Sequence, residues 1–531
     1  MRWITSIYTY ILLFIILYLG VVDMALYSYW GFKLDITPLL YIKTPGDAMA
    51  SVSIWEILFL LSIFTVLYAV SIVFYRRYFR WNIDKKPVKW YMSIPASYIS
   101  IGVLFIVARG GVGVAAMNLS RVYFHQERFA NHSAINVTWN TIYSFIEREK
   151  LQEHHSYMDE DKALENFVAL RKNMNSDHVQ LIKPGSNVLL FILESFSNKV
   201  ISALGGEEGI TPRLDSLCES SIVFTNFYAS GDRSDKGLVS IFSGYPAQPT
   251  TSIIDYPSKS QKLPFLYEIF AAEGYTTAFY YGGDLNFANF KSYFSNPGLH
   301  KLVTADDFSR KDHIQKWGVP DGIVFRRMLE DLDHTNQPFF YSCFSLSSHE
   351  PFDVPMEPVF GINSRDELSK NGFYYTDYEL GEFLKKASVK SWWKNTLVII
   401  TADHGSRSPG NTSNHSKEKF SIPMIWTGGA VKENGLTISR IGSQTDLPAT
   451  LLAQFKLDYS EFIYSNDLLN GNKGFAFYAF NNGFGFTSDE GFVIYDNDFD
   501  KCIFREGKSP DPLLITGKAF LQVLSTDFFN R

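Results

Sequence analysis

Cysteine is scarce in this sequence, and basic residues are not in excess. Only three cysteines, Cys218, Cys343 and Cys502, occur among 531 residues. An odd and sparse set gives no disulfide framework, and no C-x-x-C pair indicates a zinc site. Lys and Arg number 49 against 55 Asp and Glu, for a net charge of -6. That balance argues against nucleic acid as the main partner.

Three long hydrophobic runs stand in the first 111 residues, at 3–22, 54–75 and 90–108. Each has about the 20 residues that a helix needs to cross a bilayer. The aromatic content of 16% suits a membrane protein with an interfacial belt. A cleaved signal peptide is the alternative for the first run, but the run is long and lacks a small-x-small cleavage site. The sequence therefore predicts a transmembrane domain of about three helices over 1–111.

The loops between these runs differ in basic residues, which predicts the orientation of the chain. Residues 75–90, YRRYFRWNIDKKPVKW, are dense in Arg and Lys, whereas residues 23–51 contain far fewer. The positive-inside rule places the loop 75–90 in the cytoplasm and the loop 23–51 outside. We therefore expect a multi-pass protein of the cell membrane, with everything from about residue 112 extracytoplasmic.

The remaining chain divides into a polar linker and an α/β domain. Residues 112–183 carry mixed charges with apolar residues at helical spacing, which predicts a helical linker near the membrane surface. From residue 184 to 531, short apolar runs such as NVLLFIL and TLVIITA alternate with helical stretches. This alternation predicts a mixed, mostly parallel sheet flanked by helices.

Chemically active residues follow two of the predicted strands. Glu194 comes directly after NVLLFIL, and Asp403 and His404 come directly after TLVIITA. Active sites of parallel sheets lie at the carboxyl ends of the strands. A carboxylate there is costly to bury unless a cation or metal pairs with it. Carboxylate and imidazole together suit Mn²⁺, Mg²⁺ or Zn²⁺.

A serine in GDRSDKGLVSIFSGYP could complete this set. Ser234 stands where the helix DKGLVSIF begins, and a metal contact would lower the pKa of its hydroxyl and make it a nucleophile. The free amides of the helix start favour an anion such as phosphate. The alternative is that Ser234 is only an N-cap residue.

Four segments in this order, NVLLFILESFS, GDRSDKGLVSIFSGYP, SLSSHEPF and ITADHGSR, resemble the lipoteichoic acid synthase family. These membrane-anchored phosphoglycerol transferases belong to the sulfatase-like branch of the alkaline phosphatase superfamily. The resemblance covers roughly residues 185–455. It implies a sulfatase-like catalytic domain over 184–531 that moves phosphoglycerol from a phospholipid, phosphatidylglycerol in the first place, to a glycan or polymer acceptor outside the cell.

The resemblance also implies roles for individual residues. Glu194, Asp403, His404 and Ser234 match the ligands of one divalent ion, Mn²⁺ first, with Mg²⁺ and Zn²⁺ as alternatives. Ser234 matches the nucleophile, and His349 matches a histidine that contacts the substrate phosphate or protonates the leaving oxygen. The residues expected to bind substrate are Arg233, Asp284, Asn286, Asn289, Lys291 and His415.

The sequence departs from the family pattern at several points. The nucleophile is Ser where the synthases have Thr, the Trp and Arg of their glycerol phosphate pocket are not evident in NFANFKSYF, and three spans stand where they have five. A phosphoethanolamine transferase or a phosphate or sulfate ester hydrolase of the same fold is therefore the alternative function. Sulfate ester hydrolysis is disfavoured, because RSDKG lacks the Pro and Arg of the C/S-x-P-x-R maturation motif. A non-catalytic sensor or scaffold is the other alternative.

Overall fold

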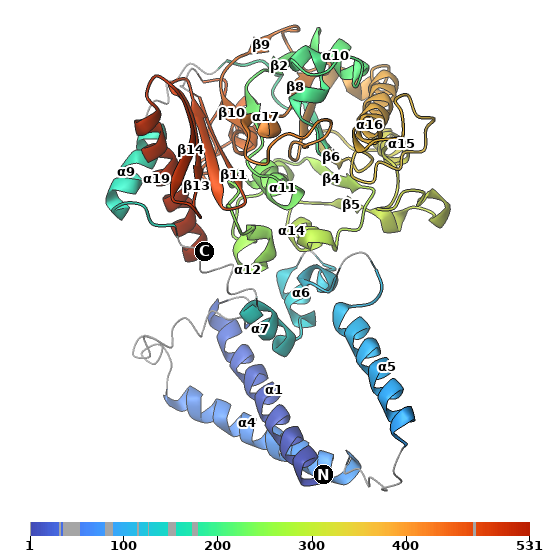
Figure 1. The fold of residues 1–531 in the computed structure, drawn as a ribbon, viewed down its shortest axis with the longest axis vertical. Helices are drawn as coiled ribbons and strands as arrows, with labels where there is room; N and C mark the ends of the chain where they lie inside the picture. The colour runs from blue at the N-terminus through green and yellow to red at the C-terminus, as the bar shows by residue number, and fades with distance from the viewer. Residues whose placement is uncertain are drawn as a thin grey trace. The chain divides into compact units, whose positions relative to one another are not determined.

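The computed structural model describes residues 2–30, 33–34, 54–79, 89–113, 116–125, 127–146, 155–171, 179–470 and 474–531. The chain forms two compact units, Met1–Glu153 and His154–Arg531. Figure 1 shows the helices and strands with their labels. Each unit is described by itself below.

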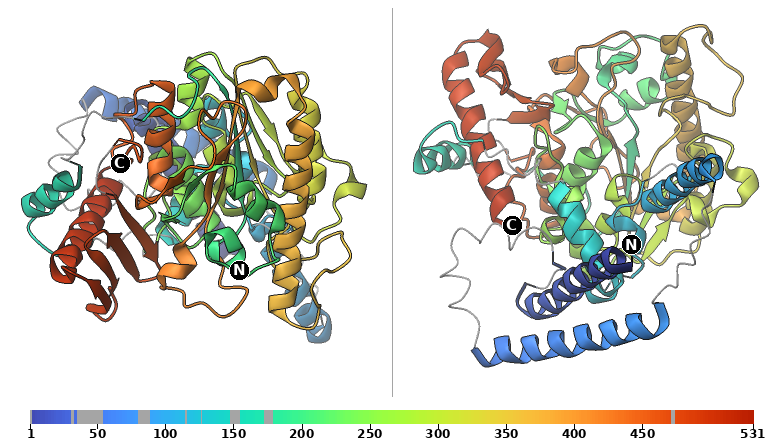
Figure 2. Two further views of the ribbon diagram at one scale, coloured as in Figure 1. Left: turned by 90° about the horizontal axis from the view of Figure 1, so that it is seen from above. Right: turned by 60° about the horizontal axis from the view of Figure 1, so that its bottom comes forward.

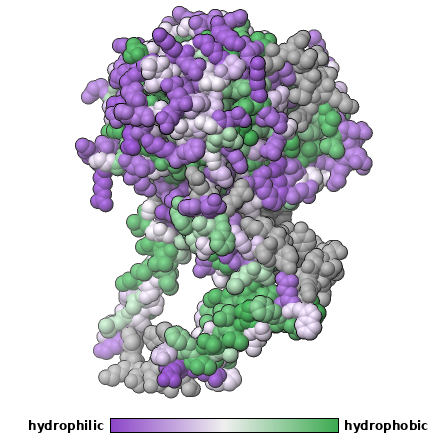
Figure 3. Space-filling model, turned by 180° about the vertical axis from the view of Figure 1, so that it is seen from behind, coloured by the Kyte–Doolittle hydropathy of each residue, from purple (hydrophilic) through white to green (hydrophobic). Residues whose placement is uncertain are grey.

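The N-terminal unit contains the three hydrophobic runs as helices: α1 (Arg2–Trp30), α4 (Ile54–Phe74) and α5 (Trp90–Arg109). All three are long and apolar enough to cross a membrane, over Trp3–Tyr27, Ile54–Tyr78 and Trp90–Arg109. Hydrophobic residues cover these helices in the space-filling view (Figure 3). The loop residues that decide the predicted orientation, most of 23–51 and 80–88 of the basic loop, lie outside the described residues.

The first part of the predicted linker belongs to this N-terminal unit. A 3₁₀ turn η3 (Leu119–Val122) and two short helices, α6 (Arg128–Ala134) and α7 (Val137–Ile146), surround a small core of Leu119, Tyr123 and Ile135. The second part, α9 (Glu160–Arg171), packs in the C-terminal unit on α19 (Pro510–Asn530), where the rings of Phe167 and Phe520 lie 5.6 Å apart. The boundaries expected at 111/112 and 183/184 stay a prediction.

An eight-stranded mixed sheet is the centre of the C-terminal unit, as the sequence predicts. The strand order is β5 (Lys301–Val303), β4 (Thr276–Tyr281), β6 (Phe339–Phe344), β1 (Asn187–Leu193), β7 (Thr396–Ala402), β8 (Met424–Thr427), β2 (Ile222–Phe224) and β9 (Thr437–Ile438). The first five strands in this order run parallel to one another. Strand β8 pairs antiparallel with both β7 and β2, and β9 is parallel to β2.

Helices cover both faces of this sheet (Figure 2). Successive residues of β4 show the two layers, because side chains of a strand alternate between faces. The Phe279 ring packs 6.1 Å from Phe242 of α11 (Ser234–Ser243), whereas the Tyr280 hydroxyl donates to Asp331 of α15 (Asp321–Leu332) on the other side. Every residue of β1 is buried, as its uninterrupted apolar run predicts.

A second sheet of four antiparallel strands lies towards the C-terminus, and the sequence reasoning did not identify it. It consists of β11 (Phe475–Phe480), β12 (Gly483–Ser488), β13 (Gly491–Asp496) and β14 (Lys501–Gly507). Helix α19 covers it, with Phe520 stacked 4.6 Å from Phe477. A two-stranded pairing of β3 (Phe227–Tyr228) with β10 (Gly442–Ser443) completes the described strands of this unit.

Candidate active site

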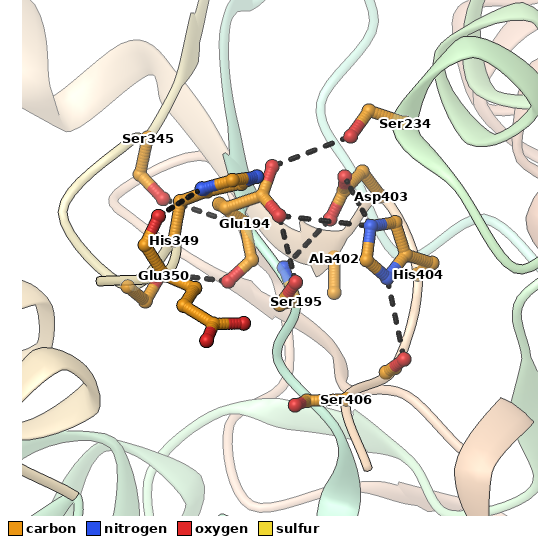
Figure 4. A network of polar contacts seen from close by, with 12 residues as sticks. Glu194, Ser195, Ser234, Ser345, His349, Glu350, Ala402, Asp403, His404 and Ser406 are labelled. Atoms are coloured by element: carbon orange, nitrogen blue, oxygen red, sulfur yellow. Dashed lines mark hydrogen bonds and ion pairs between the residues drawn. The ribbon is translucent and has the colours of Figure 1, made fainter. Parts of the chain in front are cut away.

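The register of β1 and β7 brings the predicted ligands to one edge of the sheet. Leu193 pairs with Ala402 at the last parallel position, so Glu194 and Asp403 leave the sheet side by side. His404 follows directly. One ligand atom from each of Glu194, Asp403 and His404 lies within 4.8 Å of the other two. Figure 4 shows these side chains pointing towards one another.

The contacts within this cluster are close and partly unsatisfied. His404 Nε2 lies 3.3 Å from Asp403 Oδ2 and 3.6 Å from Glu194 Oε1. Glu194 and Asp403 are buried, at 3% and 0% exposure. Asp403 Oδ2 is buried with no hydrogen-bond donor among the described residues. A buried carboxylate oxygen without a donor is costly, so this geometry fits a cation between the three side chains.

Burial and neighbouring charges shift the pKa values of Glu194 and His404. Burial and then the negative charge of Asp403 raise the pKa of Glu194. Burial alone would lower the pKa of His404, but the charges of Asp403 and Glu194 outweigh it, and the net pKa is raised. Both groups therefore favour their proton-bound forms, because the two carboxylates lie close together and are buried; a divalent ion would balance the same negative charge without those protons.

Ser234 joins this cluster from helix α11. Its hydroxyl lies 3.4 Å from Glu194 Oε2, in donating geometry. The residue at the N-cap position is Arg233, and Ser234 is the first helical residue. Because the Ser234 hydroxyl faces Glu194, the reading of Ser234 as only an N-cap does not describe this geometry.

Backbone contacts hold helix α11 against the strand end. An added Cβ on Gly237 would lie 1.9 Å from the carbonyl oxygen of Asp403, so only glycine permits this approach. The buried Gln444 side chain donates to the carbonyls of Ala402 and Asp403, both at 2.7 Å, and accepts from the Ser230 amide at 2.9 Å. The start of α11 and the end of β7 are thus fixed to each other.

His349 lies on a loop that is tied to Glu194. Ser345 Oγ accepts the Glu194 amide at 2.8 Å, and Ser348 Oγ donates to the Glu194 carbonyl at 2.6 Å. His349 Nδ1 lies 2.8 Å from the Glu350 carbonyl. A carbonyl only accepts, so Nδ1 carries the proton and Nε2 is left as the atom that can exchange one.

Trp317 is a neighbour of His349 that the sequence reasoning missed. Its Nε1 donates to the same Glu350 carbonyl at 2.7 Å, and its ring meets the His349 ring edge-on at 5.0 Å. Phe287 lies next in this row of rings, 5.8 Å from Trp317. No signal in the sequence pairs residue 317 with residue 349, because the contact depends on how two loops meet.

The segment expected to bind the head group is partly engaged within the protein. Asp284 Oδ1 accepts the backbone amide and the side-chain amide of Asn286, at 2.8 and 2.7 Å. Asn289 is buried and donates to Asp255 at 3.0 Å, a geometry that favours a supporting role. Among the described residues, the side chains of Lys291 and Arg233 make no hydrogen bond and no ion pair. The substrate-binding roles of these residues stay predictions.

Among the described residues, His415 makes no hydrogen bond or ion pair with Glu194, Asp403 or His404. Its ring lies 3.2 Å from Ser413 Oγ and 5.9 Å from the Phe480 ring. Lys419, four residues further on, was not predicted. It is buried, its Nζ lies 3.4 Å from Asn414 Oδ1, and burial lowers its pKa against the opposing charge of Asp232. Its carbonyl oxygen also approaches Gly405 closely.

Comparison with known proteins places this site in a defined family. The model of the sulfatase family matches residues 186–457. The lipoteichoic acid synthase-like protein YvgJ of Bacillus subtilis is 22% identical over 68% of this chain and 64% of its own length. A lipoteichoic acid synthase of Staphylococcus saprophyticus is 25% identical over 64% of this chain and 58% of its own length. This chain thus spans less than two thirds of these relatives.

Two solved structures share the fold. A protein of the alkaline phosphatase superfamily from Vibrio parahaemolyticus is 25% identical, with a TM-score of 0.62 over 72% of this chain and 98% of its own. The lipoteichoic acid synthase LtaP from Listeria monocytogenes is 18% identical, with a TM-score of 0.59 over 69% of this chain and 98% of its own. The predicted sulfatase-like α/β fold is confirmed.

Proposed function

The chain belongs to the sulfatase family, and from this premise we propose that it is a membrane-anchored phosphoglycerol transferase. The donor is a phospholipid, phosphatidylglycerol in the first place, and the acceptor is a glycan or polymer outside the cell. The observation that carries this proposal is the meeting of Ser234, Glu194, Asp403 and His404 at one edge of the sheet. The three apolar helices support it, since they keep the enzyme in the membrane that contains the lipid donor.

Glu194, Asp403 and His404 would hold one divalent ion together with Ser234 Oγ. Asp403 Oδ2, which has no hydrogen-bond donor among the described residues, supports a bound cation. The ligand atoms are oxygen and nitrogen, which supports Mn²⁺, with Mg²⁺ or Zn²⁺ as alternatives. Such an ion, when bound, lowers the pKa of a coordinated hydroxyl and balances the charge of the phosphoryl group.

The chain's own residues account for the remaining chemistry in two steps. Ser234 loses its hydroxyl proton to water, and its Oγ forms a bond to phosphorus while the bond from phosphorus to the diacylglycerol oxygen breaks. His349 begins this step protonated on both ring nitrogens, with Nδ1 held by the Glu350 carbonyl, and gives its Nε2 proton to that leaving oxygen. An acceptor hydroxyl then attacks the phosphoglycerol-serine and passes its proton to His349 Nε2, while the bond from Ser234 Oγ to phosphorus breaks and Ser234 regains a proton from water. The first amides of the ten-residue helix α11 favour the negative charge that develops on the phosphoryl oxygens.

Purified protein in nanodiscs with head-group-labelled phosphatidylglycerol and a cell-envelope fraction as acceptor tests this function. We expect formation of diacylglycerol together with label in the acceptor fraction, and loss of both in Ser234→Ala. Ser240→Ala on the same helix is the matched control, because the Ser240 hydroxyl shares its one proton between the Lys236 and Tyr245 carbonyls and so is not directed at Glu194. Free glycerol phosphate without a labelled acceptor would instead show a hydrolase, and absence of diacylglycerol would contradict both.

A further inference from the structure

The N-terminal unit contains a folded segment, residues 116–125 and 127–146, whose exposed apolar side chains have no cover among the described residues. Four of them are large: Phe124 is 65% exposed, Phe129 69%, Ile142 55% and Phe145 55%. Water-exposed phenylalanines at this density are unusual on a folded surface and mark a contact site. The remaining question is what covers them.

This segment is folded in its own right and is more than a flexible connector. Leu119, Tyr123 and Ile135 form its core, with Val122 and Trp139 packed against them. The buried Asn131 side chain accepts the amides of Phe124 and His125 and donates to the His125 carbonyl. The exposed phenylalanines are therefore held in place by an ordered backbone.

Contacts to α1 fix the segment at the end of a membrane span. The candidate span Trp3–Tyr27 ends at Tyr27. The Tyr27 ring lies 5.8 Å from the Phe129 ring, and its hydroxyl lies 2.9 Å from His132 Nδ1. A span of 25 residues is about 37 Å long, which exceeds a hydrocarbon core of about 30 Å, so Tyr27 stands at the membrane boundary. Phe129 must lie at the same depth.

A second attachment involves α7 and the chain just beyond α1. Asn140 Nδ2 donates to the Leu34 carbonyl at 2.9 Å. Leu34 is in turn fixed to α1, because its amide donates to Asp23 Oδ1 at 2.7 Å and Lys33 pairs with Asp23. Helix α7 is thus held beside the same end of α1. Its exposed Ile142 and Phe145 are three residues apart, so they lie on one face of the helix.

We propose that this segment forms a membrane-interfacial platform, with Phe124, Phe129, Ile142 and Phe145 inserted between the lipids of the leaflet at the C-terminal end of α1. The occupant is lipid because the platform is fixed at the depth of the span end, where headgroups and acyl chains meet. Aromatic side chains favour this zone, and amphipathic helices bury their apolar side about 5–10 Å into it. The proposal does not depend on the chemistry of the catalytic unit.

Site-specific fluorescence in the full-length protein tests the platform. The native Cys218, Cys343 and Cys502 are replaced by Ala, and single cysteines at Phe129 and at Phe145 carry an environment-sensitive dye. Ala134 is the matched control position, because it is exposed on α6 but lies five residues from Phe129 and so on a different face of the helix. In nanodiscs with doxyl-labelled lipids, we expect several-fold stronger quenching of the dye at 129 and 145 than at 134, and the reverse order with aqueous iodide.

Two outcomes would overturn the proposal. Equal iodide quenching at 129, 145 and 134 would show that the phenylalanines face water. Protection from both quenchers would show that another part of this chain or a second copy covers them. Labelling of the unaltered protein with a lipid-soluble carbene reagent checks the same point without substitutions: modified peptides must include residues 124–129 and 142–145, and their absence contradicts lipid contact.

Discussion

Replacing Gly237 by alanine should move Ser234 away from Glu194, Asp403 and His404 without changing any of these four side chains. The new methyl carbon would lie 1.9 Å from the Asp403 carbonyl oxygen, whereas ordinary contact begins at 3.4 Å. Helix α11 and the end of β7 must therefore move apart by roughly 1.5 Å. Since a misplacement of about 1 Å can cost about a hundredfold in rate, we expect at least that loss of head-group release.

The same substitution should cost stability only modestly. Overpacking of a buried contact costs about 1–3 kcal/mol, so Gly237→Ala should remain folded in nanodiscs. Gly102→Ala on α5 is the control, because nothing lies within 4 Å of its added methyl group. The assay is diacylglycerol formation at saturating lipid, with circular dichroism to verify folding. Parental activity in Gly237→Ala would refute the close approach of α11 to Asp403.

Three further substitutions probe other parts of the account. Glu194→Gln should lose bound divalent metal, measured by elemental analysis. Glu350→Gln is the control and should keep the metal, because the Glu350 carboxylate pairs with Arg365 at the surface. Metal retained at parental stoichiometry in Glu194→Gln would contradict the ligand assignment. Trp317→Phe removes the indole N–H that donates to the same Glu350 carbonyl as His349. We expect head-group release about tenfold slower, with a shifted pH profile and unchanged metal content. An unchanged rate and pH profile would show that Trp317 does not take part in the mechanism. Burial raises the pKa of Asp377 to about 7 although the amides of Arg213 and Leu214 and the charge of Arg213 oppose it, and Asp215 adds to the rise. The protonated Asp377 carboxyl stabilises the fold at low pH, and this contribution is lost as the pH rises to about 7. The unfolding temperature should therefore fall more steeply between pH 5 and pH 8 in the parent than in Asp377→Asn. Parallel curves would show that Asp377 does not titrate there.

The strands that position the site were predictable because their sequences are unambiguous. NVLLFIL and TLVIITA are short, uninterrupted apolar runs that end in polar residues, and the structure has them as β1 and β7. Their adjacency was not predictable. It depends on the pairing of Leu193 with Ala402, and no local pattern encodes which parallel strands become neighbours.

Other features were missed for different reasons. The antiparallel sheet β11–β13 did have a signal, because aromatic runs are separated by two-residue turns at 481–482 and 489–490, which is typical of hairpins. The exposed β14 has no such alternation. The contact of Trp317 with His349 and the hydrogen bonds of Gln444 to Ala402, Asp403 and Ser230 arise only when segments distant in the sequence pack together. These supporting residues therefore required the structure.

Intact mass spectrometry after incubation with phosphatidylglycerol tests the central claim most directly. If Ser234 is the nucleophile and phosphatidylglycerol the donor, the protein gains the mass of one phosphoglycerol group, located by peptide mapping on Ser234. The adduct must be absent in Ser234→Ala and present in Ser240→Ala. No adduct in the active parent protein under rapid quenching, or an adduct that persists in Ser234→Ala, would contradict the account.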